Sequence, residues 1–188
     1  MSDHLLWYLS RASGVVSVML FTAVVVLGAL TAGRRRPHGG GATIVIALHR
    51  WLSLGLVAFL AVHIVTAIAD GYVSIGWLAT VLPFTSGYET LWVGLGTIAF
   101  DLMLAVVITS LLRHRLPERL WRLVHWAAYA SWPIALVHGF AMGTGDQPVL
   151  RVVTLGCAAI GAAAVLWRVL ATHADQVRRR EIEAQEWA

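Results

Sequence analysis

Long apolar runs separated by short polar segments dominate this chain, and they predict an all-helical membrane protein. Each run holds about 20 residues with almost no charge, which is enough for a helix to cross a hydrocarbon core of about 30 Å. We identify five such runs: 10–32, 43–69, 90–112, 119–142 and 148–171. We therefore expect an integral membrane bundle of about five helices. One transmembrane domain would cover residues 1–172, and a charged cytoplasmic tail would cover 173–188.

The composition agrees with a membrane protein and excludes several redox centres. Hydrophobic residues make up 59% of the chain and charged residues 13%, with a mean hydropathy of +0.74. The single cysteine, Cys157, excludes an internal disulfide and an iron–sulfur cluster. No C-x-x-C-H motif for covalent haem attachment is present. The first run begins with polar residues and is long, so we expect a membrane helix rather than a cleaved signal peptide.

The arginines predict how the helices are oriented. All fourteen basic residues are arginines, and twelve of them flank the first and third connections or the end of the fifth run. Basic residues are enriched on the cytoplasmic side, so we expect an outer N-terminus, a cytoplasmic C-terminus and an odd number of crossings. The charge follows membrane topology, and no nucleic-acid partner is indicated. The twelve are Arg34, Arg35, Arg36, Arg50, Arg113, Arg115, Arg119, Arg122, Arg168, Arg178, Arg179 and Arg180.

Four histidines lie within the apolar runs, where an ionisable side chain is costly and points to function. His49 and His63 are 14 residues apart in the second run, and His125 and His138 are 13 apart in the fourth. Along a helix these separations are about 20 Å. Both runs point from the cytoplasm to the outside in the expected topology. His49 and His125 would therefore share an inner level, and His63 and His138 an outer level.

Two imidazoles at each level, with no cysteine or matched carboxylate, favour one kind of metal centre. Zinc needs three or four protein ligands, and a di-iron site needs several glutamates. A haem needs only two axial ligands, so two b-type haems bound without covalent links fit best. Thirteen residues do not return to one face of an ideal helix, and Pro133 is a candidate kink that would change the phase. The alternative is that the histidines form hydrogen bonds between helices.

The residues around these histidines resemble a known family. His49-Arg50 followed by Gly55, Phe59 and His63, and Arg119-Leu-Trp-Arg-Leu-Val-His125 followed by Tyr129 and His138, resemble the ligand helices of the ferric reductase-like transmembrane superfamily. That superfamily includes ferric reductases, NADPH oxidases and the haem-bearing membrane subunit of a bacterial methionine sulfoxide reductase system. The resemblance implies two stacked haems that pass electrons from the cytoplasmic side to an outer acceptor. It also implies His49 and His125 as ligands of the inner haem and His63 and His138 as ligands of the outer haem.

No segment resembles a flavin or nicotinamide domain, so we expect an oxidoreductase component whose donor is a separate flavin-containing reductase or a quinol. The acceptor would be a protein or small molecule at the outer face of a bacterial-type inner membrane. One alternative is a haem subunit dedicated to an extracytoplasmic reductase, such as methionine sulfoxide reductase. Another, from a different class, is a haem-free membrane scaffold or transporter, which predicts no Soret absorbance.

Several other residues are candidates for contact with the haems. Arg50, Arg119 and Arg122 near the inner level, and Arg11 and Arg151 near the outer level, would pair with haem propionates. Flanking charge and snorkelling are the respective alternatives. Aromatic side chains between the levels would pack in the core or line the space between the haems. They are Trp126, Tyr129 and Trp132. Small residues that permit close helix or macrocycle contact are Gly14, Gly28, Gly55, Gly94, Gly96, Gly156 and Gly161.

Overall fold

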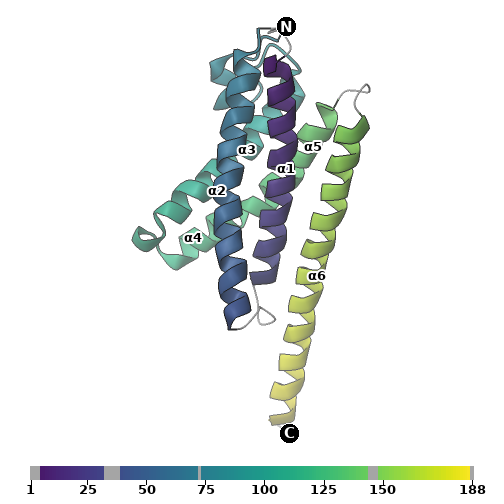
Figure 1. The fold of residues 1–188 in the computed structure, drawn as a ribbon. Coiled ribbons are helices and arrows are strands. Elements are labelled where there is room, and N and C mark those ends of the chain that lie inside the picture. The colour runs from purple at the N-terminus through teal and green to yellow at the C-terminus, as the bar shows by residue number, and fades with distance from the viewer. Residues whose placement is uncertain (1–4, 32–38, 72, 144–147, 187–188) are drawn as a thin grey trace.

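The computed structural model is all-helical over the residues that it describes: 5–31, 39–71, 73–143 and 148–186, with side chains described as far as residue 171 (Figure 1). The order is α1 (Leu5–Thr31), α2 (Gly40–Ala69), η1 (Trp77–Thr80), α3 (Thr90–Leu111), η2 (Arg113–Arg115), α4 (Glu118–His125), α5 (Ala127–Ala141) and α6 (Pro148–Glu186). The predicted all-α fold class is confirmed.

Four described helical segments are long and apolar enough to cross a membrane. They are Leu5–Thr31, Gly40–Ala69, Thr90–Leu111 and Pro148–Ala171. Large apolar side chains are exposed along them, for example Trp51 at 70% and Ile160 at 60%. Such exposure would be costly in water and is expected where a helix faces lipid tails.

The fourth predicted span is also helical, but it is divided into two pieces. Helix α4 ends at His125 and α5 begins at Ala127, so neither piece alone has the length of a span. At the break the Tyr129 amide donates to the Trp126 carbonyl at 3.0 Å, which is the tighter i to i−3 pattern. Helix α5 then continues through Pro133. The interruption therefore comes directly after a candidate ligand rather than at the proline.

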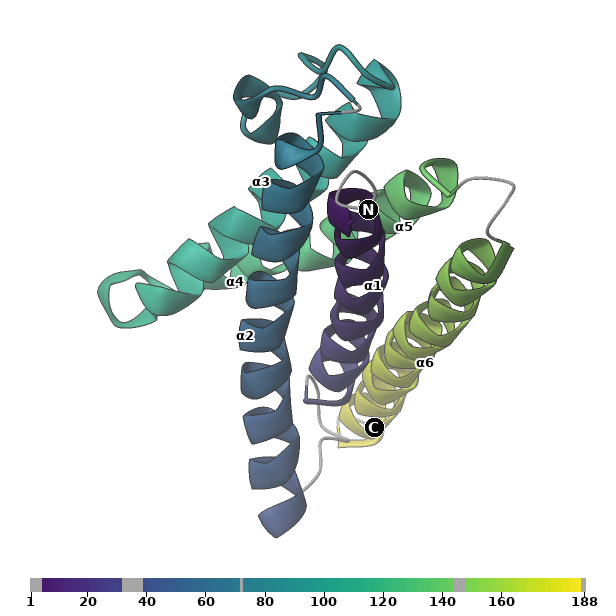
Figure 2. The same ribbon diagram turned by 45° about the horizontal axis from the view of Figure 1, so that its top comes forward.

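The helices pack around α1 and α5. Helix α1 lies between α2 and α6, while α5 packs on α3, α1 and α6. Figure 2 shows the α4–α5 rod crossing behind α2 and α1. In the described part of the chain, α2 and α5 have no extensive backbone contact, whereas α1 packs on both of them.

A buried apolar cluster fills the middle of the bundle. Trp132 of this cluster also forms a hydrogen bond, in which its Nε1–H donates to the Thr22 hydroxyl at 3.0 Å. Gly161 of α6 faces the Trp132 ring so closely that a Cβ there would lie 2.1 Å from Cζ2. The absence of a side chain therefore lets α6 approach α5. The cluster consists of Phe21, Val25, Leu56, Met103, Trp132, Leu136 and Cys157.

The connection between α2 and α3 is bound to a helix, and the tail is itself helical. Between α2 and α3, η1 is fixed to α3 because the Thr97 hydroxyl donates to the Ala79 carbonyl at 2.6 Å. Helix α6 continues as far as Glu186, so the charged tail extends the last helix. The arginines at 34–36 and residues 144–147 lie outside the described residues, as do the side chains of the tail.

Candidate functional site

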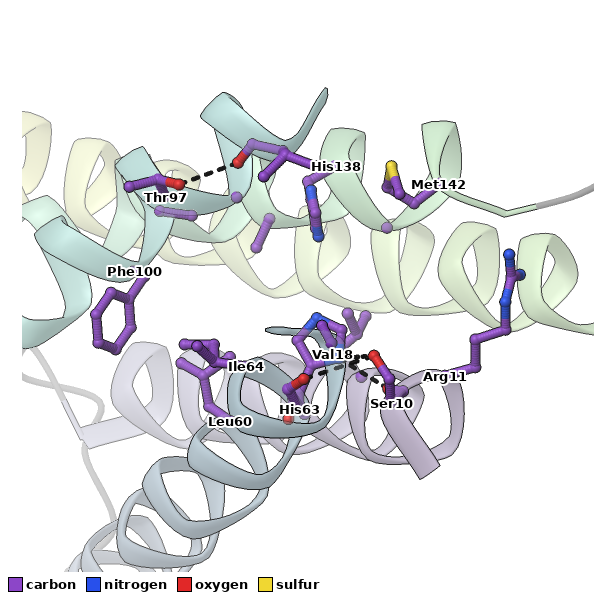
Figure 3. Close-up of a pocket in the computed structure, with 18 of the residues that line it drawn as sticks. Ser10, Arg11, Val18, Leu60, His63, Ile64, Thr97, Phe100, His138 and Met142 are labelled. Carbon is purple, nitrogen blue, oxygen red and sulfur yellow. Dashed lines mark hydrogen bonds between the residues drawn. The ribbon is translucent and has the colours of Figure 1, made fainter. Parts of the chain in front are cut away.

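The structure brings the four histidines of the apolar runs together in two pairs. His49 of α2 faces His125 at the end of α4, with ring centroids 6.5 Å apart. His63 of α2 faces His138 of α5, with ring centroids 6.3 Å apart. Figure 3 shows the rings of His63 and His138 pointing toward one another from opposite sides of a cavity. These are the two pairs that the expected topology places at a common depth.

The distance between the rings suits one metal ion in each pair. A metal–imidazole bond is about 2 Å long and the ring centroid lies about 1 Å beyond the nitrogen, so two imidazoles on opposite sides of one ion have centroids about 6 Å apart. Both observed separations are close to this value. In three of the four rings another nitrogen already has a hydrogen-bond partner.

Three of the four histidines use Nδ1 to bind a backbone carbonyl of a neighbouring helix. A carbonyl only accepts, so Nδ1 carries the proton and Nε2 keeps its lone pair for a ligand. A metal-binding histidine commonly has such a carbonyl partner, which fixes the ring and its tautomer. The three bonds join His49 to Val24 at 3.1 Å, His63 to Ser10 at 2.8 Å and His138 to Trp92 at 2.8 Å.

His125 is held differently. Its ring stacks on Trp121 one turn earlier, with centroids 4.9 Å apart and planes at 27°. The guanidinium carbon of Arg113 lies 4.5 Å from the centre of the same Trp121 ring. The buried Nδ1 of His125 has no hydrogen-bond partner among the described residues. The inner pair is therefore asymmetric, with one ring bonded to a carbonyl and one held by stacking.

The outer pair opens into a cavity of about 250 Å³ between α1, α2, α3 and α5. Its lining includes both histidines, and most of the rest is apolar, such as Phe100 (Figure 3). Arg11 lines the same cavity. It stacks on Trp7 with its guanidinium carbon 4.3 Å from the ring centre. The site thus offers two imidazoles, a largely apolar wall, the cation of Arg11 and the carboxylate of Asp70, and the imidazoles, the apolar wall and the cation suit a flat apolar ligand with carboxylate groups.

The other predicted arginines lie in different settings. Arg151 donates from Nε and a terminal nitrogen to the Gly143 carbonyl, at 3.1 and 2.8 Å. Arg50 and Arg119 are exposed. Arg122 is exposed and forms an ion pair with Glu118 on its own helix. Of the five arginines, Arg11 is the one that the structure places on the wall of the cavity.

The aromatic residues of the fourth run have separate roles. Trp132 is buried in the central cluster and Tyr129 packs against it, which confirms core packing for both. Trp126 is 57% exposed, so core packing is wrong for this residue. The break after His125 turns this side chain outward.

The carbonyl partners of the histidines were not predicted from the sequence, because any helix residue has a carbonyl. A signal was nevertheless present in α1. Gly14 and Gly28 have the same separation of 14 residues as His63 and His49, and each glycine faces one of these rings.

Comparison with known proteins adds one match. The family model for the ferric reductase like transmembrane component matches residues 13–142, which is more than half of the chain and includes all four histidines. No curated protein matches the chain, and no solved structure does. Within the described residues, no three His, Cys, Asp or Glu side chains gather as a metal-binding group. The donors that the described residues bring together at each level are two imidazoles.

Proposed function

Because the chain belongs to the ferric reductase-like transmembrane component family, we propose that it is a membrane b-type cytochrome that transfers electrons across the bilayer. Two stacked haems would be bound, the inner one by His49 and His125 and the outer one by His63 and His138. The observation that carries this proposal is the double pairing of imidazoles at 6.5 and 6.3 Å on opposite sides of a space large enough for one metal ion.

The donor set supports a haem over a bare metal ion. Zinc would need at least one more protein ligand at each level, whereas a porphyrin brings four nitrogens and leaves two axial positions for histidine. When bound, the haem supplies one-electron transfer between ferric and ferrous iron. The protein supplies the axial nitrogens in a fixed tautomer, because the Nδ1 atoms of three histidines are bound to carbonyls.

The helices also set the distance and the environment between the two levels. The 14 residues from His49 to His63 separate the levels by about 21 Å along α2. Buried side chains of five helices pack in the middle of the bundle, including Phe21, Met103 and Trp132. These side chains are apolar, and a low-polarity surrounding is one of the means by which a protein tunes the potential of a haem.

We further propose that Arg11 pairs with a carboxylate of the outer haem, since its side chain lines the cavity that holds His63 and His138. The electron donor would be a separate flavin-containing reductase or a quinol, and the acceptor a protein or small molecule at the outer face. The membrane would be a bacterial-type inner membrane. A subunit dedicated to a sulfoxide-repair reductase would be one instance of this arrangement.

A haem count on purified protein tests the proposal. We expect a pyridine haemochrome assay to give two b haems per chain after haem-replete expression, with a reduced-minus-oxidised α band. His63→Ala and His49→Ala should each lower the count to one, because each removes one axial ligand of one haem. His114→Ala is the matched control, since His114 is exposed in η2 outside the pairs, and it should keep both.

The opposite results would identify the alternative. Protein that folds and contains no haem would overturn the proposal and favour a scaffold or transporter whose histidines bond helices together. A count that falls equally in His114→Ala and in His63→Ala would show that the loss reflects general instability rather than ligation.

A further inference from the structure

The three carbonyls that bind histidines share one local feature. In each case a glycine stands four residues later in the same helix. The carbonyl of Ser10 precedes Gly14, the carbonyl of Val24 precedes Gly28, and the carbonyl of Trp92 precedes Gly96. The three cases occur in two different helices, α1 and α3, so they do not follow from a single repeat within one element.

Helix geometry explains why a glycine at this position matters. A Cβ atom on a helix is tilted toward the N-terminus, and its side chain covers the surface of the preceding turn. The side chain at i+4 therefore stands beside the carbonyl of residue i, which already accepts the helical amide of i+4. A carbonyl oxygen has a second lone pair, and an outside donor reaches it most easily when residue i+4 has no side chain.

Distances from the three glycines show that the histidine rings occupy this space. A Cβ on Gly14 would lie 2.9 Å from His63 Nδ1, and one on Gly96 would lie 2.7 Å from His138 Nδ1 and Cε1. Either Cβ would displace the ring from its carbonyl. A Cβ on Gly28 would lie 3.5 Å from His49 Cε1, which is ordinary contact. The bond of His49 to its carbonyl is also the longest of the three.

His125, the fourth histidine, shows the converse. It lacks a hydrogen-bond partner for Nδ1 among the described residues. Helix α3, which provides the carbonyl for His138 and also packs on α4, has no glycine after Gly96. Where the glycine is missing, the carbonyl bond is missing as well, and the ring stacks on Trp121 instead.

We propose that Gly14 and Gly96 are positioning residues, which open the carbonyl of the preceding turn to the Nδ1–H of an axial histidine; at Gly28 a Cβ would meet the ring only at ordinary contact distance, so this position tolerates a side chain. The inference rests on the proposed haem ligation. A bond from Nδ1–H to a carbonyl makes the other nitrogen a stronger donor to the metal. Stronger donation stabilises ferric iron, so the outer haem, with two carbonyl-bound ligands, depends on Gly14 and Gly96 for both its retention and its potential.

Alanine substitution in the full-length haem protein, followed by haem counting and redox titration, tests this inference. Gly14→Ala and Gly96→Ala should each weaken retention of the outer haem, by about 10- to 100-fold as for other lost ligand-orienting bonds. Where the haem is retained, its reduction equilibrium should shift tenfold toward the ferrous form, a rise of about 59 mV in midpoint potential. Because both glycines act on one pair, both variants should shift the same titration wave.

Two variants serve as controls. Gly156→Ala makes the same change in α6, where a Cβ would meet nothing within 4 Å, and Gly28→Ala adds a Cβ at ordinary contact distance. We expect both to keep two haems with unchanged potentials. The inner haem retained in Gly14→Ala would show that the variant is folded.

The outcomes separate this inference from the proposed function. Wild-type protein with two haems, together with Gly14→Ala and Gly96→Ala that behave like Gly156→Ala, would overturn the role of the glycines alone. Loss of both haems together, or shifts in different waves for the two variants, would also overturn it, because the effect would not be confined to one pair. Wild-type protein without haem would overturn the proposed function and this inference with it.

Discussion

Each of the histidines at the centre of this protein has two nitrogens to satisfy in a largely apolar surrounding. An imidazole buried without partners would lose the hydrogen bonds that it makes in water, at a cost of about 1–3 kcal/mol for each group. The Nδ1–H of His63 donates to the Ser10 carbonyl at 2.8 Å. Its Nε2 therefore remains available on the side of His138, the other ring of the outer pair. The pairing across 6.3 Å therefore leaves a shared position between two rings, which a metal ion would satisfy at both sides.

The proposed role of the Arg11 charge at the outer cavity can be tested directly. Its side chain lines the outer cavity, and a positive charge near a haem favours the reduced state. We expect Arg11→Gln to lower the midpoint potential of the outer haem, with a change of about tenfold in the reduction equilibrium, or about 59 mV. A spectroelectrochemical titration that resolves the two waves measures this shift.

Arg122→Gln is the control for that experiment. Arg122 is exposed and paired with Glu118 on its own helix, and exposed pairs contribute little, so we expect unchanged potentials and stability. Equal shifts in both variants would show that the effect comes from net charge and not from the position of Arg11.

At the scale of the helices, the apolar pattern was sufficient to predict the elements. The ends of the second and third runs agree with α2 and α3 to within a few residues, because a segment that crosses lipid must be apolar along its whole length. The break at Trp126 was not predictable in this way. Residues 119–142 have the composition of one span. The hydrogen bond from the Tyr129 amide to the carbonyl three residues earlier depends on how the helices pack.

The candidate site was predictable only in part for the same reason. The spacing of His49 and His63, with the arginine bias, predicts which residues meet. The partner of each Nδ1 depends on the face that α1 and α3 present, which sequence periodicity does not show in a helix that is apolar all round. A glycine four residues after the residue whose carbonyl accepts the bond is the sign of that contact in the sequence.

The packing of α6 on α5 gives a prediction for these elements. Gly161→Ala would place a Cβ 2.1 Å from Trp132 Cζ2, and overpacking of a core costs about 1–3 kcal/mol. Gly156→Ala makes the same backbone change in open space, and it should gain up to about 1 kcal/mol from helix propensity. Unfolding of the two variants in detergent, followed by circular dichroism, should therefore give Gly161→Ala the lower free energy of unfolding. Equal stabilities would show that α6 does not depend on this contact.

At the scale of the whole molecule, the direction of electron transfer through the two histidine pairs would depend on how the bundle is oriented in the membrane. The twelve arginines near the first and third connections and the last helix predict that the His49 level is cytoplasmic. Electrons would then enter near α4 and leave near the connection between α2 and α3. The orientation is therefore as important to the proposed function as the ligands are.

Cysteine labelling in intact cells tests that orientation. The native Cys157 is buried and should react little, whereas Thr85 and His114 are both exposed, in the second and third connections. We expect Thr85→Cys to react with a membrane-impermeant maleimide in spheroplasts, and His114→Cys to react only after permeabilisation, because basic residues such as Arg113 and Arg115 favour the cytoplasmic side for its connection. The reverse pattern would place the His49 level outside and would require electrons to flow in the opposite direction through the same pairs.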